Sequence, residues 1–178
     1  MERRVALLRG INVGPNKRIA MPALRDLLTR AGFEDVETYV QSGNVVLSTE
    51  LAPDDLEREC ERLISEEFGF HVDVVTRSRE ELVKVVERNP FGDIATNPKR
   101  YQVSFLSAEL EPQRVEALAA AATESERFVS LGRELYAWHP DGVARSRLWA
   151  KLAAPSLGVK ATARNWATVT TLLAMADS

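Results

Sequence analysis

Two short polar stretches near the start of the chain carry side chains suited to holding an anion. The first, Arg9–Gly14, sets an arginine and an asparagine among glycines directly after the apolar run Val5–Leu8. The second, Gln41–Asn44, reads Gln-Ser-Gly-Asn between two apolar runs. An arginine guanidinium binds phosphate or carboxylate with two parallel hydrogen bonds, and successive N–H groups of a glycine turn form an anion-binding concavity. The two stretches therefore predict an anion site if the fold brings them together.

The candidate ligand-binding residues are the polar side chains and glycines of these stretches, a nearby lysine, and two residues near the far end. They are Arg9, Gly10, Asn12, Gly14, Lys17, Gln41, Ser42, Gly43, Asn44, Arg164 and Asn165. Lys17 and Arg18 can close over a ligand held by the first stretch. In the alternative interpretation, the glycines only serve the turns, and Asn12 and Asn44 only cap local backbone.

The second group of candidates lies at a predicted helix start, where backbone N–H groups favour an anion. Asn165 is a natural N-cap there, and Arg164 precedes it. Trp166 can stack on a ligand, but such a tryptophan more often docks its helix to the core. None of the candidate stretches matches Walker A or Gly-x-Gly-x-x-Gly, so no nucleotide fingerprint applies.

Other kinds of site receive little support. His71 and His139 have no cysteine or acid at ligand spacing in the sequence, so we expect no metal. Cys60 falls on the inner stripe of a predicted helix and is expected to be a buried structural thiol. We find no Ser-His-Asp set and expect no cofactor. Tyr136 and Trp138 share a sheet face, as in ferredoxin-like RNA binders, but packing is the likelier role for them because the basic aromatic signature is missing.

The composition is that of a globular domain, with 178 residues and a net charge of −3. A single cysteine cannot form an intramolecular disulfide, which favours the reducing cytoplasm. No apolar run reaches the ~18 residues of a membrane span, so we expect no membrane partner. Basic residues concentrate in segments 1–20 and 140–178, which suits an anionic small molecule. The pI of 5.6 makes nucleic acid a less favoured partner, and the oligomeric state stays open.

Apolar periodicity predicts the elements that position the first two stretches. Over residues 3–76 the order is strand, helix, strand, strand, helix, strand, as in a ferredoxin-like unit. The predicted strands are Arg3–Arg9, Val36–Gln41, Val45–Ser48 and His71–Thr76. The first predicted helix begins near Pro22, and the second spans Pro53–Phe68. In this order the end of the first strand and the turn between the second and third strands share one edge. Arg9–Gly14 and Gln41–Asn44 are therefore expected to be neighbours.

The same order repeats further along the chain. The predicted elements are strands Tyr101–Leu106, Glu126–Leu131, Glu134–His139 and Val159–Ala163, helices Pro112–Ala122 and Ala144–Ala154, and a last helix Asn165–Ala176. Before them, Ser78–Glu81 forms a capping box that opens a helix ending near Asn89. We predict an α+β protein of two tandem ferredoxin-like (βαββαβ) units with antiparallel sheets plus a C-terminal helix. The first unit spans 1–77, a connecting helix and turn span 78–100, and the second unit with the C-terminal helix spans 101–178.

Three of the stretches already described resemble a family of bacterial proteins known as domain of unknown function 1697. They are Leu7–Gly14, Tyr39–Val45 and Thr162–Val169. The resemblance extends over essentially the whole chain and implies two ferredoxin-like units. It implies no established activity. The motif residues of the family coincide with the polar sets chosen above, which strengthens the prediction of a binding site.

Three classes of function remain open. The first is binding of a phosphate-bearing small molecule, a nucleotide or a nucleic-acid end at the edge formed by Arg9–Gly14 and Gln41–Asn44. The second is a structural or protein-interaction module whose motif residues lock the two units together. The third is an enzyme, for which Asp26, Asp35 and Glu37 are available acids without a convincing arrangement.

Overall fold

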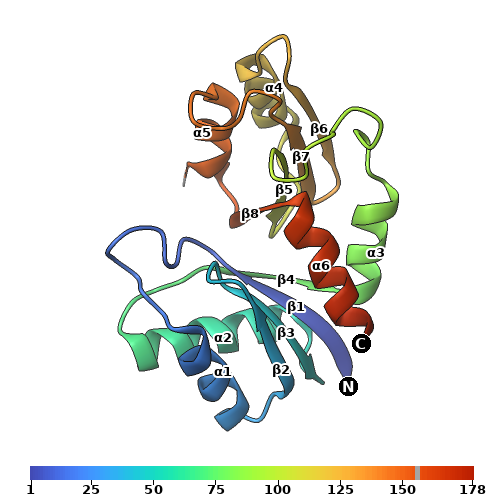
Figure 1. The fold of residues 1–178 in the computed structure, drawn as a ribbon. Helices are drawn as coiled ribbons and strands as arrows, with labels where there is room; N and C mark the ends of the chain where they lie inside the picture. The colour runs from blue at the N-terminus through green and yellow to red at the C-terminus, as the bar shows by residue number, and fades with distance from the viewer. Residues whose placement is uncertain (155–156) are drawn as a thin grey trace. The chain divides into compact units, whose positions relative to one another are not determined.

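The chain folds into two compact units, shown in Figure 1. The computed structural model describes residues 1–154 and 157–178. Unit 1 comprises Met1–Val83 and Leu172–Ser178, and unit 2 comprises Lys84–Thr171. The chain passes from unit 1 to unit 2 within helix α3 (Arg79–Glu87) and returns within helix α6 (Trp166–Asp177).

Unit 1 contains a four-stranded antiparallel sheet with the strand order β2-β3-β1-β4. Its elements follow the order βαββαβ, and the predicted ferredoxin-like arrangement is confirmed. They are β1 (Glu2–Leu8), α1 (Met21–Arg30), β2 (Glu34–Tyr39), β3 (Asn44–Thr49), α2 (Pro53–Phe68) and β4 (Val74–Ser78). Central strand β1 pairs Val5 with Val46 on one side and with Arg77 on the other.

Helices α1 and α2 cover one face of this sheet (Figure 1). Alternate residues of β1, Ala6 and Leu8, join the core beneath the helices. The helices contribute one apolar stripe each at helical spacing, namely Leu24, Leu27 and Leu28 from α1 and Leu56, Cys60 and Ile64 from α2. Cys60 is 1% exposed, which confirms its expected burial.

Local signals set the ends of the helices. Gly32 follows α1 with φ +100°, and the bonds Gly32 N–H to Thr29 O and Phe33 N–H to Leu28 O form a Schellman motif. Gly69 ends α2 in the same left-handed conformation. Ser78 and Glu81 exchange side-chain-to-backbone hydrogen bonds of 3.1 and 2.9 Å, so the predicted capping box is confirmed.

Unit 2 repeats the architecture with the strand order β6-β7-β5-β8. Its elements are β5 (Tyr101–Leu106), α4 (Pro112–Ala121), β6 (Arg127–Leu131), β7 (Glu134–Trp138), α5 (Arg147–Ala153) and β8 (Ala161–Asn165). Leu118 and Ala121 of α4 are buried. Ala119 is exposed, because the helix turns Ala121 toward the core instead.

Several predicted boundaries are wrong for identifiable reasons. Strand β4 begins at Val74 rather than His71, because β1 ends at Leu8, which pairs with Val74. The turn between β2 and β3 spans residues 40–43, and Asn44 is the first residue of β3, paired with Leu7. Helix α5 begins three residues later than predicted, because Ser146 caps it by accepting the Trp149 N–H at 3.0 Å.

Candidate functional site

The end of β1 and the β2–β3 turn lie side by side, as the predicted strand order requires. The Leu8 N–H donates to Gly43 O at 2.9 Å. Beyond it, Asn12 Nδ2 donates to Gln41 O at 2.6 Å. The structure therefore brings together the candidate residues Arg9, Gly10, Asn12, Gly14, Lys17, Gln41, Ser42, Gly43 and Asn44 at one edge of the unit 1 sheet. We call residues 9–20 the cationic loop.

Asn12 organises the cationic loop. Its Nδ2 donates to Ile19 O at 2.9 Å, and its Oδ1 accepts the Ile19 N–H at 2.9 Å. Its own N–H donates to Lys17 O at 3.1 Å, and its φ of +56° is left-handed, which asparagine tolerates. Ile11 and Ile19 are buried in the core at 1% and 2% exposure. The structure thus shows that Asn12 holds the backbone of the loop in place. The two buried isoleucines fix the loop at both ends.

The β2–β3 turn is also tightly specified. A Cβ on Gly43 would lie 2.7 Å from Leu8 Cβ and 3.0 Å from Ile11 Cδ1, and φ here is +87°. Asn44 is fully buried, and its Nδ2 donates to Tyr39 O and Ser42 Oγ at 3.0 Å each. Val40 has φ +50° although it is β-branched, a conformation that such residues rarely adopt. Strain of this kind tends to gather at functional sites.

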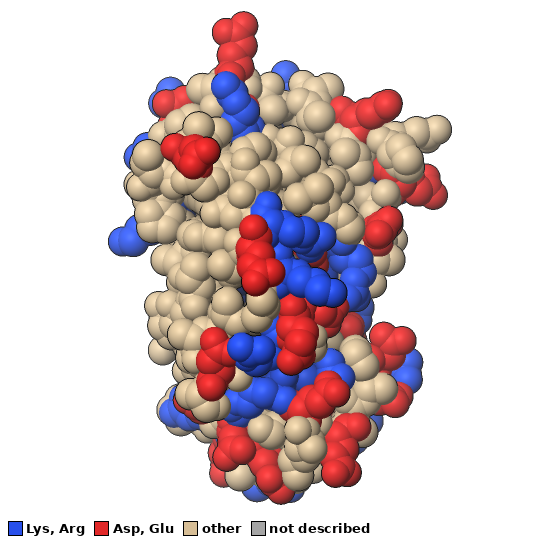
Figure 2. Space-filling view, turned by 90° about the vertical axis from the view of Figure 1, so that its right-hand side faces the viewer, with Lys and Arg blue, Asp and Glu red and all other residues tan. Residues whose placement is uncertain are grey.

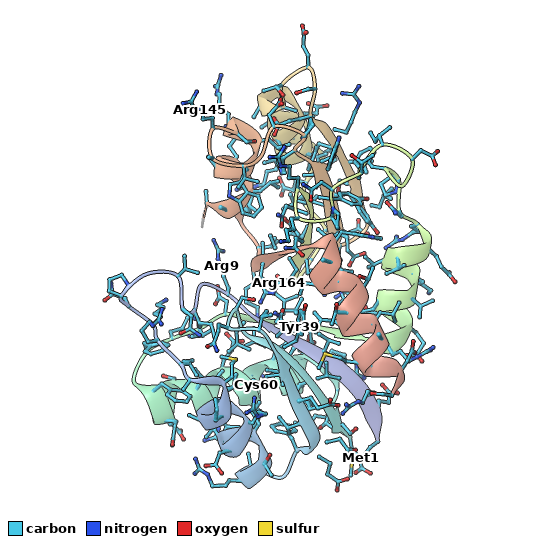
Figure 3. The ribbon with its side chains drawn as sticks, in the orientation of Figure 1. Met1, Arg9, Tyr39, Cys60, Arg145 and Arg164 are labelled. Carbon is cyan, nitrogen blue, oxygen red and sulfur yellow. The ribbon has the colours of Figure 1, made fainter. Side chains whose placement is uncertain are left out.

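The positive charge of the loop comes from Arg9, Lys17 and Arg18, and residues 9–20 include no acid. Arg9 follows β1 and points away from α1 and α2 (Figure 3). Lys17 and Arg18 are exposed, and the Arg18 guanidinium donates only to backbone oxygens, those of Gly14 at 3.3 Å and Asn12 at 3.5 Å. Within the described residues neither side chain pairs with a carboxylate. By contrast, surface arginines such as Arg58 and Arg62 form ion pairs.

The remaining candidates, Arg164 and Asn165, belong to unit 2. Arg164 is 7% exposed and donates to Thr162 Oγ1 at 2.6 Å and Ala163 O at 2.9 Å. Burial lowers the pKa of its guanidinium to about 10. Asn165 Oδ1 accepts the Thr168 N–H at 2.9 Å, which confirms the predicted N-cap. Trp166 stacks on Tyr101 at a centroid distance of 4.9 Å, so it docks the start of α6 on β5.

Sequence spacing missed acids next to both histidines. Fully buried His139 Nδ1 lies 2.5 Å from Glu126 Oε2, which also accepts the Ser146 hydroxyl at 2.6 Å. His71 likewise has Asp73 and Glu61 beside it. Sequence spacing gave no sign of these acids, because Glu126 and Glu61 come from other elements and Asp73 lies on the same side of an extended segment as His71. Only the alternation of residues along that segment, which puts His71 and Asp73 on one side, could have given a signal.

The Glu126–His139–Ser146 cluster is a buried polar network that uses His139 Nδ1, whereas His139 Nε2 is buried with no hydrogen-bond partner among the described residues. Glu126 also accepts the Thr123 N–H at 3.0 Å, so both carboxylate oxygens are used. Burial acts to raise the pKa of Glu126, but the hydrogen bonds it accepts, led by that of Ser146, lower it below its usual value. Ser146 donates to Glu126 and caps α5, so its hydroxyl is committed as well. A cavity of about 440 Å³ adjoins Glu126 and Ser146, but the network offers it no free group of either residue.

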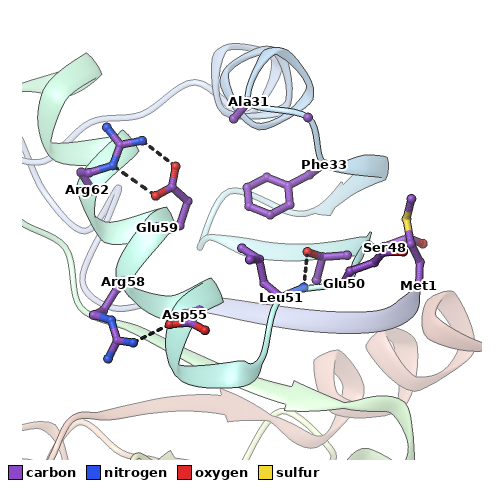
Figure 4. Close-up of a pocket in the computed structure, with 12 residues that line it drawn as sticks. Met1, Ala31, Phe33, Ser48, Glu50, Leu51, Asp55, Arg58, Glu59 and Arg62 are labelled. Carbon is purple, nitrogen blue, oxygen red and sulfur yellow. Dashed lines mark hydrogen bonds and ion pairs between the residues drawn. The ribbon is translucent and has the colours of Figure 1, made fainter.

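A larger cavity, of about 630 Å³, is lined by unit 1 residues at the other end of its sheet (Figure 4). Phe33 and Leu51 form its apolar lining, and Arg58 and Arg62 stand at its rim. These arginines are already neutralised by Asp55 at 2.5 Å and Glu59 at 2.5 Å. None of the predicted ligand residues lines this cavity, so cavity size and candidate chemistry point to different places. The cationic loop is the better candidate for an anion site, because its exposed cations lie on a loop fixed at both ends, whereas the arginines of the cavity are already paired with carboxylates.

Basic and acidic side chains interleave on the face of the molecule drawn in Figure 2. Such mixing differs from the continuous basic stripe of a protein that coats nucleic acid. Among the described residues, no helix combines the length and apolar character needed to cross a bilayer.

Fold and candidate site together define an α+β protein of two ferredoxin-like units with a polar edge on the first. Comparisons with known proteins agree with this class. The family model for DUF1697, a protein family of unknown function, matches residues 1–136, and the chain belongs to that family. The matched range includes the motif stretches at Leu7–Gly14 and Tyr39–Val45, whereas Thr162–Val169 lies beyond it.

One solved structure supports the fold over nearly the full chain. It is that of a conserved bacterial protein, SP0830 from Streptococcus pneumoniae, with a TM-score of 0.78 and 23% sequence identity. The alignment covers 98% of each chain. At this identity the likeness concerns the fold alone. No curated relative matches the sequence.

Proposed function

We propose that the cationic loop of unit 1, together with the Gln41–Asn44 turn, binds a phosphate-bearing small molecule. The observation that carries the proposal is the pair of exposed cations, Lys17 and Arg18, on a loop that has no acid and is fixed at both ends. Elsewhere in unit 1, exposed arginines such as Arg30 are neutralised by carboxylates. A cation held without a counter-ion favours an anionic ligand.

The backbone of the loop supports the same ligand class. Gly10, Asn12, Gly14 and Lys17 all have positive φ, at +71°, +56°, +103° and +53°. Alternation of left-handed with other conformations turns successive N–H groups toward one side, as in anion-binding nests. In this arrangement Asn12 and Asn44 hold the backbone, because their side-chain amides form hydrogen bonds with it. The residues that contact the ligand are Arg9, Lys17, Arg18, Gln41 and Ser42.

The length of the loop is a further point in favour. Twelve residues, 9–20, join β1 to α1, whereas most connections between elements have about 4–6 residues. Loops of such length without secondary structure of their own are commonly functional. Here the strained Val40 lies on the neighbouring turn, and strain persists only where the surrounding structure holds it in place.

The experiment is a titration of the whole chain with inorganic phosphate, phosphorylated metabolites and a short oligonucleotide, followed by calorimetry and thermal shift. The test variant is Lys17→Ala/Arg18→Ala. The variant removes two cations, and loss of even one charge-assisted hydrogen bond, worth about 1.5–3 kcal/mol, weakens binding at least about tenfold. Because both side chains are exposed, the melting temperature without ligand should stay within about 1 °C of the wild type.

Arg58→Ala is the matched control, since it removes an exposed arginine at the other end of the same sheet. A phosphorylated ligand that stabilises the double variant as much as the wild type would sink the proposed site. Arg9→Ala tests the alternative of a structural or protein-interaction module. If that variant unfolds while Lys17→Ala/Arg18→Ala binds normally, the motif residues serve the structure and the anion proposal fails.

A further inference from the structure

Three metal-ligating side chains gather in unit 1 at the segment that leads into β4. They are Glu61 on α2 and His71 and Asp73 on that segment. His71 Nε2 lies 2.7 Å from Asp73 Oδ1 and 3.7 Å from Glu61 Oε2. One ligand atom from each residue lies within 4.8 Å of the other two.

The backbone explains why these residues meet. His71 and Asp73 are two residues apart on an extended segment, so their side chains leave the same side of it. Val72 between them points the other way and is 1% exposed in the core. Helix α2 packs beside β4, as the bond from Thr76 Oγ1 to Glu57 Oε1 at 3.2 Å shows, and Glu61 follows one turn later on the same side of α2.

The separations suit a bound metal ion. With metal–ligand bonds of about 2.0–2.2 Å, neighbouring ligands of a tetrahedral or octahedral ion stand about 2.8–3.6 Å apart. The two separations from His71, 2.7 and 3.7 Å, bracket this range, and all three ligand atoms lie within 4.8 Å of one another. The three side chains are 16%, 32% and 66% exposed for Glu61, Asp73 and His71. Glu61 and Asp73 are thus held on the body of the unit, while the imidazole leaves further coordination positions to water.

We propose that Glu61, His71 and Asp73 bind a divalent transition-metal ion of the zinc class. An imidazole nitrogen with two carboxylates is a mixed N/O ligand set, which prefers zinc to the hard magnesium ion. The histidine distinguishes this cluster from groups of exposed carboxylates on surface helices, which contain no nitrogen ligand. The site stands independently of anion binding by the cationic loop, although the Arg9 N–H donates to Asp73 O at 3.0 Å and so joins the two regions.

The test exploits the two histidines of the chain, one exposed and one buried. Chelator-treated, ¹⁵N-labelled whole protein is titrated with ZnCl₂ and followed by imidazole ¹H–¹⁵N correlation spectra and calorimetry. The His71 resonances should shift and saturate at one ion per chain, while those of fully buried His139 stay in place. MgCl₂ at equal concentration should cause no such shift.

Three variants remove one ligand each, namely His71→Ala, Asp73→Asn and Glu61→Gln. Loss of a partner that only supports a ligand weakens metal affinity about 10–100-fold, so each variant should lose at least about tenfold. Glu66→Gln, which changes an exposed carboxylate elsewhere on α2, should bind as the wild type does. Unmoved His71 resonances, or undiminished zinc binding by His71→Ala, would overturn the proposal.

Discussion

Asn12 Nδ2 donates a 2.6 Å hydrogen bond to the backbone oxygen of Gln41, 29 residues along the chain. The same side chain holds both the N–H and the carbonyl of Ile19. Its two amide hydrogens are therefore both used. Asn12, in the middle of the family motif, thus fixes the conformation of the cationic loop. The exposed cations Lys17 and Arg18 are the groups of this loop that can contact a ligand.

Asn12→Ala should destabilise the chain by about 2–3 kcal/mol, because three hydrogen bonds of about 1 kcal/mol each are lost. Urea unfolding of the whole chain measures this. Asn16→Ala is the control, since Asn16 lies on the same loop and is exposed, and it should change stability by less than about 0.5 kcal/mol. Equal effects of the two substitutions would show that the Asn12 bonds do not fix the loop.

Gly43→Ala should cost about 2–5 kcal/mol. An added Cβ meets Leu8 Cβ at 2.7 Å, and overpacking of this kind costs about 1–3 kcal/mol. The left-handed φ of +87° adds about 1–2 kcal/mol for alanine. Gly14→Ala separates the two contributions, because φ there is +103° with nothing within 4 Å of the added atom. If both variants lose the same stability in thermal unfolding, the close approach to Leu8 is unimportant.

Sequence patterns predicted the fold well where a local signal decides the structure. The limits of α2 follow from Pro53 and Gly69, and the capping box from Ser78 and Glu81. The start of β4 was predicted three residues too early. The start depends on where the neighbouring strand β1 ends, and no residue near His71 indicates where β1 ends. The positions at which α3 and α6 pass from one unit to the other likewise depend on contacts between residues far apart in the sequence, which local patterns do not indicate.

Acidification should reveal the Glu126 network. The folded pKa of Glu126 lies below its usual 4.5, so its ionised form stabilises the fold above that value, and this stability is lost as pH falls through the folded pKa. Glu126→Gln should cost about 3–5 kcal/mol at pH 7, as loss of one partner of a buried pair does. The deficit relative to the wild type should shrink progressively below about pH 4.5.

Urea unfolding from pH 7 down to pH 3 measures this difference. Glu116→Gln, at an exposed position of α4, is the control and should follow the wild type throughout. A Glu126→Gln deficit that is the same at every pH would argue against an ionised Glu126 in the folded state.

The Cys60 thiol should resist modification in the folded protein. Burial, together with the nearby carboxylates led by Glu59, raises its pKa to about 12. A disulfide reagent at pH 8 should therefore react slowly with the native chain and rapidly in denaturant. Because Cys60 is the single cysteine of the sequence, absorbance of the released thiolate reports on this site alone. Stoichiometric reaction within seconds under native conditions would contradict the buried position.

The candidate site was predicted in part. The strand order predicted that Arg9–Gly14 and Gln41–Asn44 meet, since βαββαβ connectivity puts both at one edge. The partners of the two histidines escaped prediction, because Glu61 and Glu126 approach from other elements. Asn12 shows a further limit, since its residue type fits both a ligand contact and a loop support, and only the three hydrogen bonds identify the second.

Unit 1 is discontinuous, and this affects how the protein can be made. Its residues 172–178 include Asp177, the ion-pair partner of Arg79 at the start of α3. On a ribosome the first 83 residues emerge early, but their closing segment is synthesised only after all of unit 2. Unit 1, whose synthesis begins first, is therefore also the second of the two units to have its sequence completed.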